Sequence, residues 1–142
     1  MKYLFSTSKT LGRAVYIVAG KRTPIGSFNG KLSSFQAVEL GEFAVKGALE
    51  SINLNPKEVD EVIMGNVLGA GLGQAPARQV AVRGGIGLDV PCTTINKVCS
   101  SGLKSVCFGA QSIGLDQADL VVTGGFESMS KAPFVLHNVC SK

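Results

Sequence analysis

The sequence predicts an α/β domain in which parallel strands alternate with helices. Short apolar, β-branched runs alternate along the chain with stretches of helical periodicity, which is typical of parallel βαβ units with right-handed crossovers. Of the 142 residues, 45% are hydrophobic and only 17% are charged, so the chain has enough apolar material for one buried core. The 18 glycines follow no repeat period and indicate many tight connections.

The first predicted element is a buried strand over 15–19, which is apolar and β-branched and ends at Gly20 before a loop over 23–26. Ser33 and Gln36 then form a capping-box pattern, which predicts the start of a helix. Apolar residues recur after it at helical spacing and predict an amphipathic helix: Val38, Val45, Leu49 and Ile52.

The rest of the chain repeats the alternation. Asn55 and Pro56 predict a short helix with asparagine as its cap. Further strands are predicted at 62–64, 93–98 and 120–125, and helices at 76–83 and from about Cys99 to Gly114. The glycine-rich stretch 69–73 lacks the full G-x-G-x-x-G spacing, so a flexible turn is favoured there over a phosphate-binding loop.

Composition argues against several classes of function. The net charge of +4 is spread along the chain without a polybasic run, so we expect no nucleic-acid partner. No apolar stretch approaches the roughly 20 residues that span a bilayer, so we expect no membrane partner. The single histidine, His137, rules out a multi-histidine metal site within this chain and disfavours a Ser-His-Asp triad. We therefore expect no metal.

The cysteines indicate reduced thiols. Cys92, Cys99, Cys107 and Cys140 include no pair with the C-x-x-C spacing of zinc or thioredoxin-type sites. The apolar composition and the lack of a secretory leader favour an intracellular protein without a disulfide framework.

The N-terminal segment 1–13 differs in composition from the rest. It holds Lys2, Lys9 and Arg13, several hydroxyl side chains and no acidic residue. This composition is typical of a mitochondrial transit peptide. The alternatives are an ordinary disordered N-terminus and a cytoplasmic protein.

Cys99 is the leading candidate for a chemical role, because it lies where a strand gives way to a helix. The first N–H groups of a helix have no partner within it, and their partial positive charge favours a thiolate. The same groups can stabilise an oxyanion when the thiolate attacks a carbonyl. Gly102 would let a substrate or a neighbouring loop approach. The alternative is a plain buried thiol, since cysteine is among the most buried residue types.

The helix after Cys99 carries a single charge, Lys104. One stripe is apolar, and Cys107, Gly109 and Ser112 make the other face small, so we expect both faces to be packed. The apolar stripe consists of Leu103, Val106, Ala110 and Ile113.

The other candidates for chemistry are weaker. Cys92 and Cys107 are interpreted as structural, and nothing near His137 in the sequence would orient it as a base. Glu127 follows a predicted strand and a Gly-Gly pair. It is either catalytic or, more commonly for an acid in such a place, the tether of a loop after a strand.

Five segments in order give the sequence a resemblance to a known family. They are 18–26 (VAGKRTPIG), 64–67 (MGNV), 73–79 (GQAPARQ), 94–102 (TINKVCSSG) and 124–130 (GGFESMS). Together they resemble the N-terminal part of thiolases, especially of the acetoacetyl-CoA type, over about 15–138. A decarboxylating ketoacyl synthase shares the fold, but the strand before Cys99 argues against it.

The resemblance implies an acyltransferase in which Cys99 is the acyl-accepting nucleophile. Its thiolate would attack the thioester of acetyl-CoA or acetoacetyl-CoA, and the acyl group would pass to a second acetyl-CoA or back to CoA. The Cys99 N–H would contribute to an oxyanion hole. Coenzyme A thioesters would be substrates, with no permanently bound cofactor and no assigned cofactor-binding residues. The complete protein would be a homodimer or tetramer acting in lipid metabolism.

The resemblance also implies a thiolase-like layered α/β fold of two similar halves, of which this chain holds most of the N-terminal βαβαβαβ half. On this basis 1–13 is a transit peptide or disordered N-terminus, 14–138 an incomplete thiolase N-terminal domain and 139–142 an aberrant tail. The family's GHP histidine, Asn-Glu-Ala-Phe motif and CxGGG cysteine are not in the sequence. We therefore expect the chain to lack the C-terminal catalytic half. The alternative is an inactive, truncated thiolase-like module that dimerises with a full-length relative.

Overall fold

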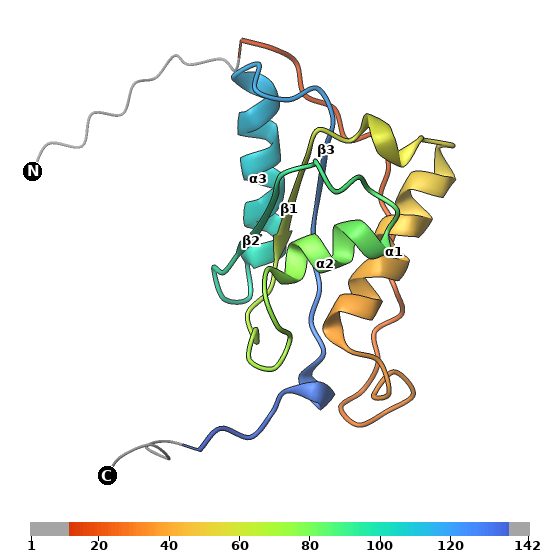
Figure 1. The fold of residues 1–142 in the computed structure, drawn as a ribbon, viewed down its shortest axis with the longest axis vertical. Helices are drawn as coiled ribbons and strands as arrows, with labels where there is room; N and C mark the ends of the chain where they lie inside the picture. The colour runs from red at the N-terminus through yellow and green to blue at the C-terminus, as the bar shows by residue number, and fades with distance from the viewer. Residues whose placement is uncertain (1–11, 137–142) are drawn as a thin grey trace, which may run out of the picture.

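A three-stranded parallel sheet forms the centre of the molecule. The computed structural model describes residues 12–136, and its strands β1 (Glu61–Gly65), β2 (Cys92–Ile95) and β3 (Val121–Gly125) lie in the order β2–β1–β3. At the end of β1, Gly65 pairs with Ile95 on one side and Gly125 on the other. The carboxyl ends of the strands therefore meet at one edge of the sheet, the lower one in Figure 1.

Two crossover helices cover opposite faces of this sheet. Helix α2 (Pro76–Arg83) joins β1 to β2, and helix α3 (Ser101–Gly114) joins β2 to β3. The connection from β1 to β2 and the connection from β2 to β3 run across the sheet in opposite directions, because β2 and β3 lie on opposite sides of β1. Right-handed crossovers then require α2 and α3 on opposite faces, as Figure 1 shows. The predicted layered α/β architecture is confirmed.

The hydrophobic core lies on the α2 face of the sheet, beneath α2 and helix α1 (Ala37–Ser51). Fully burying one valine, leucine, isoleucine, methionine or phenylalanine side chain stabilises a fold by about 1.5–3 kcal/mol. The buried core residues are Ala37, Val38, Val45, Leu49, Val59, Val62, Met64, Ala77, Val80, Ala81, Ile86, Val90 and Phe126. No helix among the described residues is long and apolar enough to cross a membrane.

Helix α1 begins later than its predicted cap. Gln36 is the N-cap, and its N–H donates to the Glu39 carboxylate at 2.7 Å. Ser33 and Gln36 therefore do not form the capping box, because the acid that reaches back lies three residues after Gln36. Asn55 does cap the predicted short helix, η1 (Pro56–Glu58), by accepting from the Lys57 N–H at 3.1 Å.

The predicted buried strand over 15–19 does not form within the described part of the chain. Tyr16, Ile17 and Val18 are 78%, 82% and 62% exposed. A strand forms only where a neighbour takes up its backbone hydrogen bonds. No strand of the described sheet pairs with this segment. Its apolar composition alone therefore does not bury it.

Helix α3 packs on the sheet through its small residues. Ser101, Ser105 and Gly109, each one turn apart, are buried against it. A Cβ on Gly109 would come within 2.6 Å of β3, so the helix axis lies close to the strands. Leu103 is 69% exposed and Cys107 is exposed. The expectation of two packed faces is wrong within residues 12–136, since Leu103 of the apolar stripe and Cys107 of the predicted small face are both exposed.

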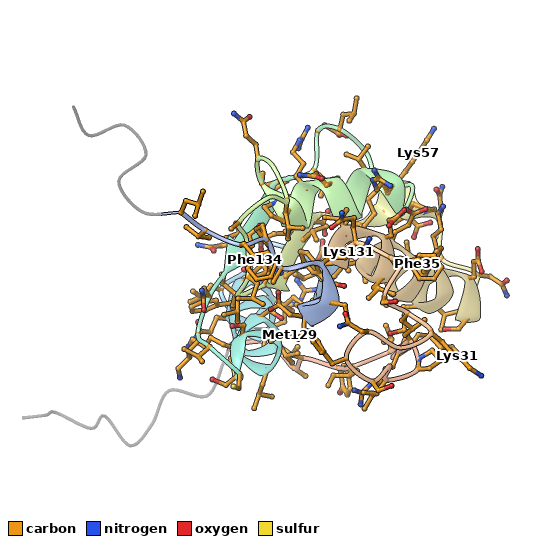
Figure 2. The ribbon with its side chains drawn as sticks, turned by 90° about the horizontal axis from the view of Figure 1, so that it is seen from below. Lys31, Phe35, Lys57, Met129, Lys131 and Phe134 are labelled. Atoms are coloured by element: carbon orange, nitrogen blue, oxygen red, sulfur yellow. The ribbon has the colours of Figure 1, made fainter. Side chains whose placement is uncertain are left out.

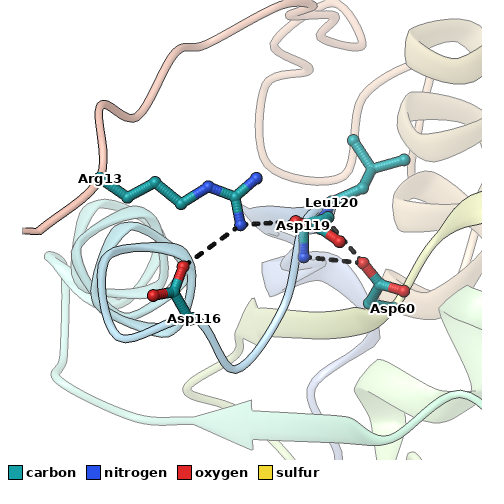
Figure 3. A network of polar contacts seen from close by, with 5 residues as sticks. All are labelled: Arg13, Asp60, Asp116, Asp119 and Leu120. Carbon is teal, nitrogen blue, oxygen red and sulfur yellow. Dashed lines mark hydrogen bonds and ion pairs between the residues drawn. The ribbon is translucent and has the colours of Figure 1, made fainter.

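Arg13 ties the start of the described chain to the end of α3 (Figure 3). Its guanidinium pairs with Asp119 and, at 3.6 Å, with Asp116. Beside this pair the Asp60 carboxylate accepts hydrogen bonds from the N–H groups of Asp119 and Leu120, both at 2.9 Å. These bonds join the residue before β1 to the residues before β3.

Stability is expected to depend on pH through Asp60. The backbone N–H groups of Leu120 and Asp119 lower the pKa of this carboxyl below its ordinary value of 3.8. A depressed pKa contributes stability above the ordinary value and loses it as the pH falls through the folded value. At neutral pH we expect the free energy of unfolding of the wild type to exceed that of Asp60→Asn by less than about 1 kcal/mol, since the Asp60 carboxylate is exposed. Urea unfolding should show this difference shrinking below about pH 4. A pH-independent difference would contradict the role.

Several predictions fall on residues outside the described range. They concern the N-terminal segment before Gly12, the tail 139–142, His137 and Cys140.

Candidate active site

An open groove of about 750 Å³ lies at the carboxyl edge of the sheet. In parallel α/β proteins, ligands commonly bind at this edge. The groove is lined by the residues that come directly after the strands, and the segment 21–28 closes one side. The lining after the strands consists of 65–68, Val98, Cys99, Ser101, Gly102 and 125–130. Figure 2 looks onto this end of the molecule.

Cys99 lines this groove and is exposed. It lies just before Ser100, the N-cap of α3, so its predicted place at the junction of a strand and a helix is confirmed. The alternative of a plain buried thiol is wrong. Cys92 is half-buried, and burial raises the pKa of its thiol, which fits a structural role. Cys107 is exposed on α3 and is not a core residue.

The backbone immediately before Cys99 is strained. Strand β2 ends at Ile95, earlier than the predicted end at residue 98. Val98 follows with a φ of 50°, in the left-handed region that β-branched residues rarely adopt. Such a conformation costs on the order of 1–3 kcal/mol and persists only where the surrounding structure imposes it. This turn carries Cys99 out of the line of the strand and into the groove wall.

Hydrogen bonds from side chains hold this turn. The Asn96 Oδ1 accepts from the Val98 N–H at 2.9 Å. The Ser101 Oγ accepts from the Lys97 N–H at 2.7 Å and donates to the Val98 carbonyl at 2.6 Å. Ser100 donates to the Lys97 carbonyl at 2.9 Å.

Glycines bring the start of α3 against the ends of β1 and β3. A Cβ on Gly65 would lie 2.5 Å from the Ser101 carbonyl carbon and 2.7 Å from the Gly102 nitrogen. A Cβ on Gly125 would lie 3.2 Å from the Gly102 Cα. A Cβ on Gly102 would be in ordinary contact with the end of β3, at 3.5–3.7 Å. Gly102 also lines the groove, so the approach of a substrate at this residue stays a prediction.

Glu127 tethers the loop that follows β1. Its Oε1 accepts from the Asn66 side-chain amide at 2.9 Å and the Leu68 N–H at 3.1 Å. Its Oε2 accepts from the Val67 N–H at 2.8 Å. Asn66 is buried and also donates to the Phe126 carbonyl at 3.0 Å. Since both oxygens of Glu127 are engaged, the interpretation of Glu127 as a tether is confirmed.

Glu127→Gln is expected to destabilise the fold by about 1–3 kcal/mol, because the amide cannot accept from three donors and at least one is left unpaired. Urea unfolding measures the loss. The exposed Glu58 offers a matched control, and Glu58→Gln should lie within about 0.5 kcal/mol of the wild type. Equal effects of the two substitutions would contradict the tether.

Two loops join across the groove. The Ser128 hydroxyl donates to the Phe35 carbonyl, and the Asn29 N–H donates to the Ser130 hydroxyl, both at 2.9 Å. These bonds connect the turn η2 (Met129–Lys131) to the segment before α1. Figure 2 shows Met129, Lys131 and Phe35 at this end.

The chemistry available in the groove is that of a thiol. No group of three or more His, Cys, Asp or Glu side chains in the described chain is arranged to hold a metal ion. Lys21 and Arg22 line the side of the groove. An exposed thiol before a helix N-terminus can attack an electrophilic carbonyl carbon, and the helix N–H groups favour the resulting negative charge.

The fold and the groove define a class of layered, parallel α/β proteins that present a cysteine at the ends of the strands. The family model "Thiolase, N-terminal domain" matches residues 15–142. The chain therefore belongs to the thiolase family.

Similar proteins agree with this assignment. Acetyl-CoA acetyltransferase of Schizosaccharomyces pombe is 55% identical over 120 residues, 84% of this chain and 30% of that protein. The mitochondrial acetyl-CoA acetyltransferase of Homo sapiens is 48% identical over 130 residues, 92% of this chain and 30% of that protein. The crystal structure of the Ascaris suum Acat5 thiolase, in complex with coenzyme A, aligns with a TM-score of 0.85 and 46% identity. It covers 87% of this chain and 32% of that one.

The chain spans about a third of the length of the relatives it matches. The relatives include mitochondrial enzymes and a cytosolic acetyl-CoA acetyltransferase of Gibberella zeae. Neither location is favoured by these names.

Proposed function

We propose that this chain carries the acyl-accepting cysteine of a thiolase-type acyltransferase, and that Cys99 is that residue. The observation that carries the proposal is the exposed thiol at the strained junction of β2 and α3, opening on the groove. Coenzyme A thioesters are the proposed substrates. Support comes from the relatives named acetyl-CoA acetyltransferase and from the structural neighbour in complex with coenzyme A.

In the proposed reaction the Cys99 thiolate attacks the carbonyl carbon of acetyl-CoA. A new carbon–sulfur bond forms at Cys99, the bond to the CoA sulfur breaks, and CoA leaves with the proton that Cys99 gave up. The developing oxyanion would lie beside the first N–H groups of α3. The methyl carbon of a second acetyl-CoA then attacks the acetyl carbonyl, the bond to Cys99 breaks, and acetoacetyl-CoA is released. The proton lost from that methyl group ends on the Cys99 sulfur. In the reverse direction the acetyl group returns to CoA.

Finer assignments belong to the same proposal. We infer from the resemblance that 14–138 is a thiolase N-terminal domain, that the complete protein is a homodimer or tetramer, and that it acts in lipid metabolism. A mitochondrial location through residues 1–13 is tested by fusing this segment to a fluorescent reporter. Cytosolic fluorescence would refute the transit peptide.

The direct test is incubation of the folded chain with acetyl-CoA, followed by intact mass and peptide mapping. We expect one acetyl group per chain, located on Cys99. Cys107, also exposed on α3, is the internal control and should stay unmodified. A folded chain without an adduct would contradict acyl transfer by this chain alone and would favour the alternative, an inactive module that dimerises with a full-length relative.

A further inference from the structure

We propose that Asn96 and Ser101 are positioning residues that hold Val98 in its left-handed conformation and thereby present Cys99 to the groove. The inference deepens the proposed function, since it concerns the acyl-accepting thiol. It rests on the contacts around the turn between β2 and α3.

The conformation of Val98 needs a restraint that packing does not supply. Its φ of 50° is unfavourable for a β-branched side chain. The Val98 side chain is 66% exposed, so no surrounding core wedges it in place. The restraint must therefore act on the backbone of the turn.

Ser101 provides one such restraint. It is 4% exposed, and its hydroxyl takes part in two hydrogen bonds directed backwards along the chain. It accepts from the Lys97 N–H at 2.7 Å and donates to the Val98 carbonyl at 2.6 Å. The hydroxyl thus links the two residues that precede Cys99.

Asn96 provides the second restraint from the other end of the turn. It is exposed, and its Oδ1 accepts from the Val98 N–H at 2.9 Å. The N–H and the carbonyl of Val98 are then both held by side chains. Such local bonds between side chains and backbone stabilise conformations that the backbone alone disfavours.

The elements on either side of the turn are fixed. Strand β2 pairs with β1, and the first turn of α3 lies against Gly65. The conformation at Val98 therefore decides where the Cys99 thiol lies relative to the groove.

The test measures alkylation of Cys99 by iodoacetamide in the full chain, as a rate relative to Cys107 in the same sample. Peptide mass resolves the two thiols. We expect Ser101→Ala and Asn96→Ala to lower the ratio by about fivefold or more. A fivefold change is the shift in population that corresponds to the lower end of the strain energy of the Val98 conformation.

Ser105→Ala is the matched control. Ser105 is fully buried one turn along the same helix, and it bonds to the Gly102 and Gly124 backbone instead of to the turn. Its loss should destabilise the fold and leave the ratio unchanged. An equal fall in Ser105→Ala would overturn the proposal, as would an unchanged ratio in Asn96→Ala. Because Asn96 is exposed, that variant tests the proposal even where Ser101→Ala does not fold.

A rescue separates positioning from a merely structural role. Glycine adopts positive φ at no steric cost, so Val98→Gly should restore the ratio in the Ser101→Ala background. No restoration would overturn the proposal. Alkylation needs no acetyl-CoA, so failure of acetyl transfer in the wild type would refute the proposed function while these ratios still decide the positioning role.

Discussion

Cys99→Ala is expected to abolish acetyl transfer from acetyl-CoA to the chain while leaving the fold intact. No thioester can form on a methyl side chain, so the loss should be complete. The thiol is exposed, and removing an exposed side-chain atom typically changes the free energy of unfolding by less than about 0.5 kcal/mol. Loss of the adduct with unchanged stability is the signature of a nucleophile.

Intact mass after incubation with acetyl-CoA and urea unfolding measure the two quantities. Cys107→Ala is the matched control, because it removes an exposed thiol from α3, about two turns after Cys99. It should keep the adduct. An adduct that persists in Cys99→Ala would show that another group accepts the acetyl, and the assignment of Cys99 would fail.

Gly65→Ala is expected to have the largest effect on stability among the substitutions considered, about 3 kcal/mol or more. The added Cβ would lie 2.5 Å and 2.7 Å from backbone atoms of Ser101 and Gly102. A flexible side chain can rotate away from such a contact, but the backbone at the start of a helix cannot. Relief would require α3 to move off the ends of β1 and β3.

Urea unfolding measures this loss, and Gly20→Ala is the matched control. Nothing lies within 4 Å of a Cβ at Gly20, so that variant should match the wild type within about 0.5 kcal/mol. If Gly65→Ala also stayed within that range, the close approach of α3 to β1 would be refuted.

The sequence predicted elements well where the local signal was strong. Helix α2 was expected over 76–83 and forms over Pro76–Arg83, because a proline at its first turn and a glycine after its last residue define both ends. Strands β1 and β3 were expected from continuous apolar runs, which are typical of parallel strands covered on both faces.

The segment 15–19 has an equally strong apolar pattern and was mispredicted. An apolar run becomes a strand only when a neighbouring strand accepts and donates its backbone hydrogen bonds. The residues of the run itself do not show whether such a neighbour is present. The strain at Val98 could not be predicted either, because valine is an ordinary strand residue and the strain comes from the turn around it.

The candidate site was predictable in part. Cys99 could be predicted as the candidate because it lies where a strand gives way to a helix. The role of Asn66 was missed, because it depends on a contact with Glu127 sixty-one residues away. Gly65 was missed for a similar reason, since only the approach of α3 shows that the position excludes a side chain.

The fit of α3 on the sheet has a consequence for how reactivity can be tuned. Gly109 lies about 12 Å along the helix from its first turn. A Cβ at Gly109 would lie 2.6 Å from the Thr123 side chain, so the C-terminal half of α3 would have to move away from β3. Because a helix is stiff, α3 as a whole would then change its angle to the sheet. The end that carries the thiol would then change its angle to the strands. A substitution at Gly109, which does not line the groove, would thus change the position of the Cys99 thiol relative to the groove.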